Sequence, residues 1–184
     1  GSFTLFAGAC DLGTGGDTIL LQIASQALNV DMERVQIEVS DTKTTPYDKG
    51  AYASSTTYVT GNAVKDACEQ MLRRIGETAQ KLYGLDEPPQ LVDGELVDGS
   101  GKQVDTLEEF SHQIASFTGT EQLTCTGSFK CTTAPPPYVA GFVKLRVDTE
   151  TGKVTLLDYV AMVDCGTVIN PSLARVQVEG GIAQ

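Results

Sequence analysis

The sequence predicts an α+β fold, in which a mixed, mostly antiparallel sheet forms one layer and helices pack on one of its faces as the second. Three observations support this prediction. Residues 35–39 alternate apolar and polar side chains, as in a strand with one face in water. Residues 17–28 and 56–83 carry apolar side chains at helical spacing. Apolar residues make up 41% of the 184 positions, enough to bury a core.

The first elements follow a strand, helix, strand order. Residues 3–9 are apolar enough for a strand, and a turn at residues 10–16 leads into the helix at 17–28. The strand at residues 35–39 comes next. A polar loop then occupies residues 40–54, and a loop of that length in a compact domain is usually functional.

A long helix is expected at residues 56–83. Gly61 interrupts its pattern early, which indicates close packing against another part of the backbone. Gly84 follows the last apolar position and is typical of a helix end. Pro88 and Pro89 prevent the helix from restarting.

Short elements fill the middle of the chain. Residues 91–104 predict a small hairpin. Thr106 and Glu109 have the spacing of a capping box before a helix that runs to about residue 117. Residues 123–129 are expected to form a strand.

The last part begins with a stiff proline connector at residues 134–137. Residues 142–148 and 154–163 predict a second hairpin. Asn170 and Pro171 then open a final helix, with Asn as N-cap and Pro in the first turn. We therefore divide the chain into a core part at residues 1–133 and a hairpin with a helix at residues 134–184.

Composition excludes several functions. A formal charge of −11 argues against nucleic acid and anionic membrane surfaces as partners. No apolar run approaches ~18 residues, so no membrane-spanning helix is expected. The odd number of five cysteines favours reduced thiols in a cytoplasmic protein. The single histidine, His112, cannot form a histidine metal cluster.

A glycine-rich turn is the first segment that could carry chemistry. It joins the first strand to the first helix and holds Gly13, Thr14 and Gly15. Glycines let a ligand approach the backbone, and a helix N-terminus offers free N–H donors to an anion. The spacing matches neither a Walker A loop nor a dinucleotide fingerprint. A phosphate-binding loop at residues 13–17 and a purely structural turn both stay open.

Two further segments are candidates. Ala53, Ser54 and Ser55 crowd small and hydroxyl-bearing residues into the loop before the long helix, where they leave room for a bulky polar ligand. The alternative is that Ser54 or Thr56 only caps that helix. The last segment, residues 163–184, contains a Gly-Gly pair within a helix, which indicates that another group approaches that face closely.

The ordered set of motifs resembles the molybdopterin-binding large subunit of the xanthine dehydrogenase and aldehyde oxidase family, the molybdenum hydroxylases. The matching stretches lie at residues 11–18, 22–24, 50–54, 57–58, 61–64, 136–138, 163–166, 169–171 and 179–184. They follow the order found in the family and cover nearly the whole chain. The resemblance implies an enzyme whose molybdenum is held by a pterin, without protein ligands to the metal.

The resemblance also assigns residues to the cofactor. Gly13, Thr14 and Gly15 would lie along it. Ala53, Ser54 and Ser55 would surround the region near the metal and the pterin phosphate, and Gln184 would reach the pterin. The family often has Gln where this chain has Thr14, and many members have Arg where it has Ser55. These departures alter the contacts expected at both positions.

The implied reaction is hydroxylation of a heterocycle or aldehyde carbon, with water as the oxygen source and a glutamate as general base. Electrons would pass to iron–sulfur and FAD domains or subunits. The glutamate is expected beyond residue 184, so no catalytic residue is assigned here. We interpret the chain as a piece of a longer protein, inactive and without cofactor when isolated. A nucleotide-binding domain and a non-catalytic scaffold are the alternatives.

Overall fold

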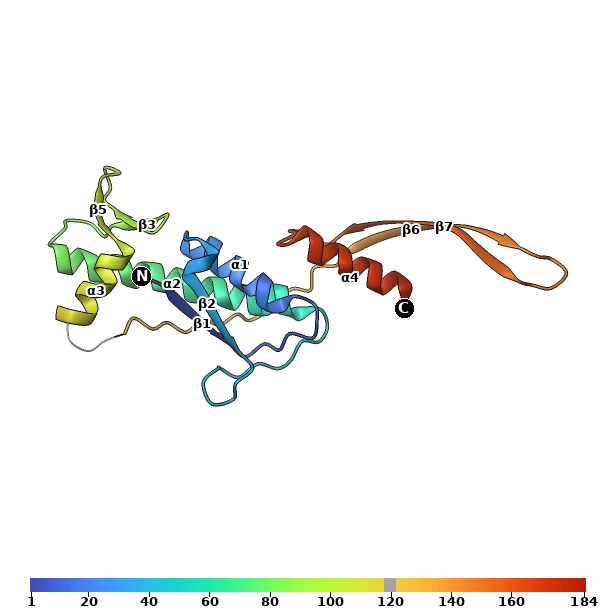
Figure 1. The fold of residues 1–184 in the computed structure, drawn as a ribbon, viewed down its shortest axis with the longest axis horizontal. Helices are drawn as coiled ribbons and strands as arrows, with labels where there is room; N and C mark the ends of the chain where they lie inside the picture. Colours follow the sequence, from blue (N-terminus) through green and yellow to red (C-terminus); the bar gives the residue numbers. More distant parts are fainter. Residues whose placement is uncertain (118–121) are drawn as a thin grey trace. The chain divides into compact units, whose positions relative to one another are not determined.

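A computed structural model describes residues 1–117 and 122–184 and confirms the α+β class. The chain forms two compact units, Gly1–Cys131 and Thr132–Gln184. Figure 1 shows the first unit in blue to yellow and the second in orange to red. The strands of the described residues belong to three small sheets, which include both parallel and antiparallel pairs.

The first unit starts with a parallel strand pair. Strand β1 (Phe3–Ala7) pairs with β2 (Val35–Val39), in a register that runs from Phe3 opposite Val35 to Ala7 opposite Val39. Parallel strands need a long crossover connection. Helix α1 (Gly16–Leu28) and the 3₁₀ turn η1 (Met32–Arg34) supply it.

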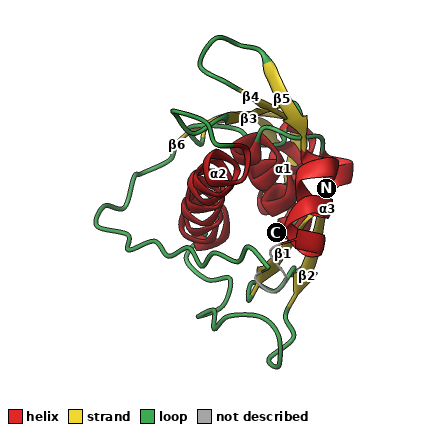
Figure 2. Cartoon of the chain, turned by 90° about the vertical axis from the view of Figure 1, so that its left-hand side faces the viewer, coloured by secondary structure: helices red, strands yellow, loops and turns green. Residues whose placement is uncertain are grey.

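Two helices enclose the core of this unit. Helix α2 (Gly61–Tyr83) follows a π-helical turn, η2 (Thr56–Thr60), and lies beside α1 (Figure 2). Leu20 and Ala24 of α1 and Ala79 of α2 are almost completely buried. A Cβ on Gly61 would lie 2.8 Å from Ile23 Cδ1, so the close packing predicted at Gly61 is confirmed. Gly84 ends α2 in the left-handed conformation, as expected.

A small antiparallel sheet and a third helix complete the end of the unit. Strands β3 (Gln90–Val92), β4 (Glu95–Val97) and β5 (Gln103–Thr106) form three neighbouring strands where the sequence predicted a hairpin. Helix α3 (Leu107–Phe117) begins at the predicted cap, where the Glu109 N–H donates to Thr106 Oγ1 at 3.2 Å.

The strand predicted at residues 123–129 is wrong. Within the part of the chain that the structure describes, this segment pairs with no strand, because its polar groups bond to side chains of α2 instead. Gln70 and Arg74 donate to the carbonyls of Thr126 and Thr124, at 3.3 and 2.8 Å. Gly127 lies directly against the α2 backbone, since a Cβ there would collide with the Ala63 carbonyl oxygen. Alternating apolar residues alone could not reveal this packing.

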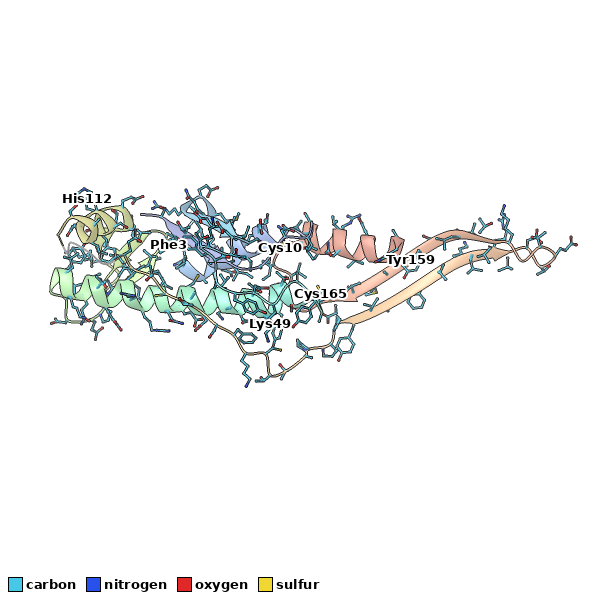
Figure 3. All side chains as sticks on the ribbon, turned by 90° about the horizontal axis from the view of Figure 1, so that it is seen from below. Phe3, Cys10, Lys49, His112, Tyr159 and Cys165 are labelled. Atoms are coloured by element: carbon cyan, nitrogen blue, oxygen red, sulfur yellow. The ribbon has the colours of Figure 1, made fainter. Side chains whose placement is uncertain are left out.

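The second unit is a long hairpin followed by a helix. Strand β6 (Tyr138–Val147) pairs antiparallel with β7 (Val154–Asp164), so the predicted hairpin is confirmed and is longer than expected. Its side chains project from both faces (Figure 3). Helix α4 (Pro171–Ala183) has the predicted cap, since the Leu173 N–H donates to Asn170 Oδ1 at 3.1 Å.

The two faces of the hairpin differ along its length. One face is apolar throughout, with the cross-strand pairs Val139–Val163, Val143–Tyr159, Leu145–Leu156 and Val147–Val154. The other face is apolar near the start of β6 and polar near the connecting turn, where Arg146 faces Thr155. At the first face, Val178 and Ile182 of α4 share a hollow with Tyr159.

Candidate functional site

The glycine turn between β1 and α1 depends on backbone conformations that favour glycine. Gly13 and Gly15 have φ angles of 88° and 78°, in the left-handed region. Space around Gly13 is open, since no atom lies within 4 Å of a Cβ placed there. Gly13 and Thr14 are exposed, and Gly15 is half-buried. The turn therefore presents backbone and one hydroxyl to the surroundings.

The carboxylate of Asp11 binds the N–H groups of this turn. Its Oδ1 accepts from Gly13, Thr14 and Gly15 at 2.8, 3.0 and 3.2 Å, and its Oδ2 accepts from Asp17 at 3.5 Å. Burial raises the pKa of Asp11, but these N–H groups outweigh it and hold the pKa below its usual value. Four of the N–H groups that the sequence predicted to be free are therefore occupied by Asp11.

Asp17 places a second acidic group beside the turn. Burial, followed by the charge of Asp11, raises the pKa of Asp17. A phosphate entering the turn would have to displace Asp11 and approach two acidic groups. The geometry therefore disfavours a phosphate-binding loop at residues 13–17.

The loop before α2 is held by Asp48. Its Oδ1 accepts from the Gly50 N–H at 2.7 Å, and its Oδ2 accepts from the Thr60 hydroxyl at 3.3 Å. Neither η2 nor α2 has a side-chain cap, so the structure does not support Ser54 or Thr56 as a mere helix cap. Ala53 and Ser54 are exposed.

Two consecutive residues of this loop are strained. Ala53 and Ser54 have φ angles of 52° and 54°, although neither is glycine. Such conformations cost roughly 1–3 kcal/mol each and concentrate at functional sites. The strain therefore marks these two positions as candidates for a binding role.

The two predicted loops meet at the N-terminus of α1. A Cβ on Gly16 would lie 3.8 Å from Thr56 Cγ2 and 3.9 Å from Thr14 Oγ1. Thr56 directly follows Ser55 in the chain. The glycine turn and the segment at residues 53–56 thus lie on the same side of the first unit.

Residues of the final segment lie in the other unit. Gln184 is exposed, and its N–H donates to the Gly180 carbonyl at 3.2 Å. No atom lies within 4 Å of a Cβ placed on Gly180 or Gly181, so the close approach expected there is not seen among the described residues. Cys165 is exposed in this unit, whereas His112 is exposed on α3 (Figure 3).

The side chains that converge at this site are small and mostly carry hydroxyl groups. Among the described residues, no group of three or more His, Cys, Asp or Glu side chains could hold a metal ion. The converging loops offer hydroxyls of Thr14, Ser54 and Ser55 and exposed backbone, which can bind a large polar organic group.

Among the residues that the structure describes, no helix is both long and apolar enough to cross a membrane.

Sequence reasoning missed Asp11 and Asp48 as the groups that hold the two loops. A signal was available, since each precedes a glycine by two residues and Asp commonly accepts from the N–H two positions onward. The additional bonds that Asp11 makes depend on the turn returning to its carboxylate, which the spacing does not show.

Comparisons with known proteins point to one family. The family model described as molybdopterin cofactor-binding domain matches residues 1–184. A protein of Escherichia coli (strain K12) named "probable hypoxanthine oxidase XdhD" is 35% identical over 183 residues, which are 98% of this chain and 19% of that protein. The xanthine dehydrogenase molybdenum-binding subunit of Escherichia coli O157:H7 is 32% identical over 189 residues, 99% of this chain and 25% of that protein.

Solved structures share the fold. Quinoline 2-oxidoreductase from Pseudomonas putida 86 matches with a TM-score of 0.82 and 27% identity, over 96% of this chain and 23% of that one. The Cu,Mo-CO dehydrogenase matches with a TM-score of 0.81 and 24% identity, over 95% of this chain and 22% of that one. The chain thus spans about a fifth to a quarter of the proteins it matches.

Proposed function

Because the chain belongs to the molybdopterin cofactor-binding domain family, we propose that it forms part of the cofactor site of a molybdenum hydroxylase. The enzyme would oxidise a heterocycle or aldehyde with water as the oxygen source. The observation that carries this proposal is the convergence of the glycine turn and the strained loop at the N-terminus of α1.

Each loop would bind a different portion of the cofactor. Gly13, Thr14 and Gly15 would lie along it, and Ala53, Ser54 and Ser55 would surround the region near the metal and the phosphate. Gln184 would contact the pterin. The bound cofactor supplies the two-electron redox chemistry, while these residues bind and orient it and exclude water.

A nitrogen heterocycle is the favoured substrate class. Two relatives carry names that refer to hypoxanthine and xanthine, and a structural match is named for quinoline. The general-base glutamate would lie beyond residue 184, and electrons would leave through iron–sulfur and FAD domains or subunits. We place the enzyme in the cytoplasm, where reduced thiols persist.

The alternatives have less support. A nucleotide- or phosphate-binding role for residues 13–17 conflicts with the Asp11 carboxylate that binds the N–H groups of the turn. A purely structural scaffold gives no reason to retain strain at Ala53 and Ser54.

The experiment is cofactor and activity analysis of the full-length protein that contains this sequence, expressed in a host that makes molybdopterin. We expect about one molybdenum and one pterin per chain, and oxidation of hypoxanthine or quinoline with an artificial electron acceptor. Residues 1–184 alone should carry neither and turn over nothing.

The same analysis decides among the alternatives. Oxidation of aldehydes only would replace the heterocycle assignment within the same enzyme class. A full-length protein without molybdenum or pterin would contradict the proposed function. A rise in melting temperature with nucleotides would favour the phosphate-binding alternative.

A further inference from the structure

Asp11 accepts more backbone donors than the other aspartates that begin turns in the described residues. Asp98 accepts two N–H groups, from Ser100 and Lys102, and Asp148 accepts two, from Glu150 and Thr151. Asp11 accepts four, and the last comes from Asp17 in the first turn of α1. An ordinary turn does not require this arrangement.

The extra bonds oppose the flexibility of the turn. Two glycines with positive φ are costly to order, because glycine loses more backbone freedom on folding than any other residue. A carboxylate at the N-terminus of a helix is also favoured by the helix dipole. Asp11 therefore keeps the turn at Gly13 and Gly15 in one conformation.

We propose that Asp11 is a positioning residue, which holds the glycine turn ready for the cofactor and keeps its N–H groups from binding phosphate. This inference rests on the proposed function, because the contact between turn and cofactor is proposed there. With the N–H groups of the turn occupied and Asp11 and Asp17 nearby, the turn suits a neutral hydrogen-bonding portion of the cofactor, such as the pterin ring. The Thr14 hydroxyl and the backbone carbonyls are the groups it can offer.

The test compares Asp11→Ala and Asp11→Asn with the matched control Asp98→Ala, which removes a carboxylate from another turn of the same unit. Amide hydrogen exchange is followed by mass spectrometry in peptides covering residues 12–17. Molybdenum and pterin contents are measured in the full-length protein. The exchange measurement needs no cofactor and can be made on apoprotein.

We expect Asp11→Ala to speed exchange in this segment by about tenfold or more and to lower the pterin content severalfold. Asp11→Asn retains an oxygen that can accept from the Gly13 N–H. It should therefore bring both the exchange rate of this segment and the pterin content back toward the wild-type values. Asp98→Ala should match the wild type in both measurements.

Unchanged exchange in Asp11→Ala would overturn the inference, as would faster exchange with full pterin content. Loss of slow exchange throughout the chain in Asp11→Ala would indicate that this variant is unfolded, and Asp11→Asn is then the deciding variant. Slow exchange at residues 12–17 together with a near-normal pterin content in Asp11→Asn supports the inference. Any other result for Asp11→Asn overturns it. A wild-type protein without pterin would overturn the proposed function, while the exchange comparison alone still decides whether Asp11 holds the turn.

Discussion

At the scale of single residues, strain at Ser54 connects the fold to the proposed site. Ser54 has a φ of 54°, which glycine adopts without strain. The variant Ser54→Gly should leave the free energy of unfolding unchanged or raise it by up to about 1 kcal/mol. It should also lower the pterin content of the full-length protein, because it removes the hydroxyl. A clear loss of stability in denaturant unfolding would show that Ser54 is not strained.

The hydroxyl of Tyr83 donates to Asp105 Oδ2 at 2.5 Å. Burial, and then the hydrogen bond and charge of Asp105, raises the pKa of Tyr83 above its usual value. Because the pKa is raised in the folded state, the stabilisation is fully present below the unfolded pKa of about 10 and is lost as the pH rises above 10 and through the folded pKa.

Tyr83→Phe should therefore cost roughly 1–2 kcal/mol at pH 7 and remove the part of the stability loss that sets in above about pH 10. Urea unfolding at several pH values measures both effects. Parallel pH curves for the two proteins would contradict the assignment.

At the scale of elements, the segment at residues 122–131 shows how α2 organises the first unit. A Cβ on Gly127 would collide with the Ala63 carbonyl oxygen. Gly127→Ala should lower the free energy of unfolding by about 1–3 kcal/mol and expose the segment to proteolysis near Lys130. Gly99→Ala is the control, since its nearest neighbour is the end of the Glu87 side chain at 3.6 Å. Equal protease sensitivity of the two variants would refute the packing.

Some elements could be predicted from the pattern of neighbouring residues in the sequence, and others could not. Helical spacing predicted α1 and α2, and Asn170 with Pro171 predicted the start of α4, because these signals act within a few residues. The segment at residues 123–129 was misassigned because Gln70 and Arg74, far away in sequence, bind its carbonyls. The glycine turn was located correctly. That Asp11 would bind its N–H groups could not be predicted, because this depends on the turn folding back onto the Asp11 carboxylate.

At the scale of the whole molecule, the β6–β7 hairpin leaves apolar surface uncovered. Leu145 is 45% exposed and Leu156 is 63% exposed, and they face each other on the apolar face. We expect residues 1–184 in isolation to self-associate through this face. Leu145→Glu should shift sedimentation toward monomer. Arg146→Glu, on the opposite face, should not, and a chain that is monomeric at all concentrations would contradict the expectation.

The proposed contact between the glycine turn and a molybdenum-bearing pterin can be tested with one matched pair of variants. Gly13 and Gly101 have φ angles of 88° and 82°, and no atom lies within 4 Å of a Cβ placed on either. Alanine therefore adds similar strain at both positions, but only Gly13 belongs to the proposed site. In the full-length protein, metal and pterin analysis should show that Gly13→Ala loses most of its cofactor and that Gly101→Ala keeps it. Equal cofactor contents in the two variants would show that the glycine turn does not touch the pterin.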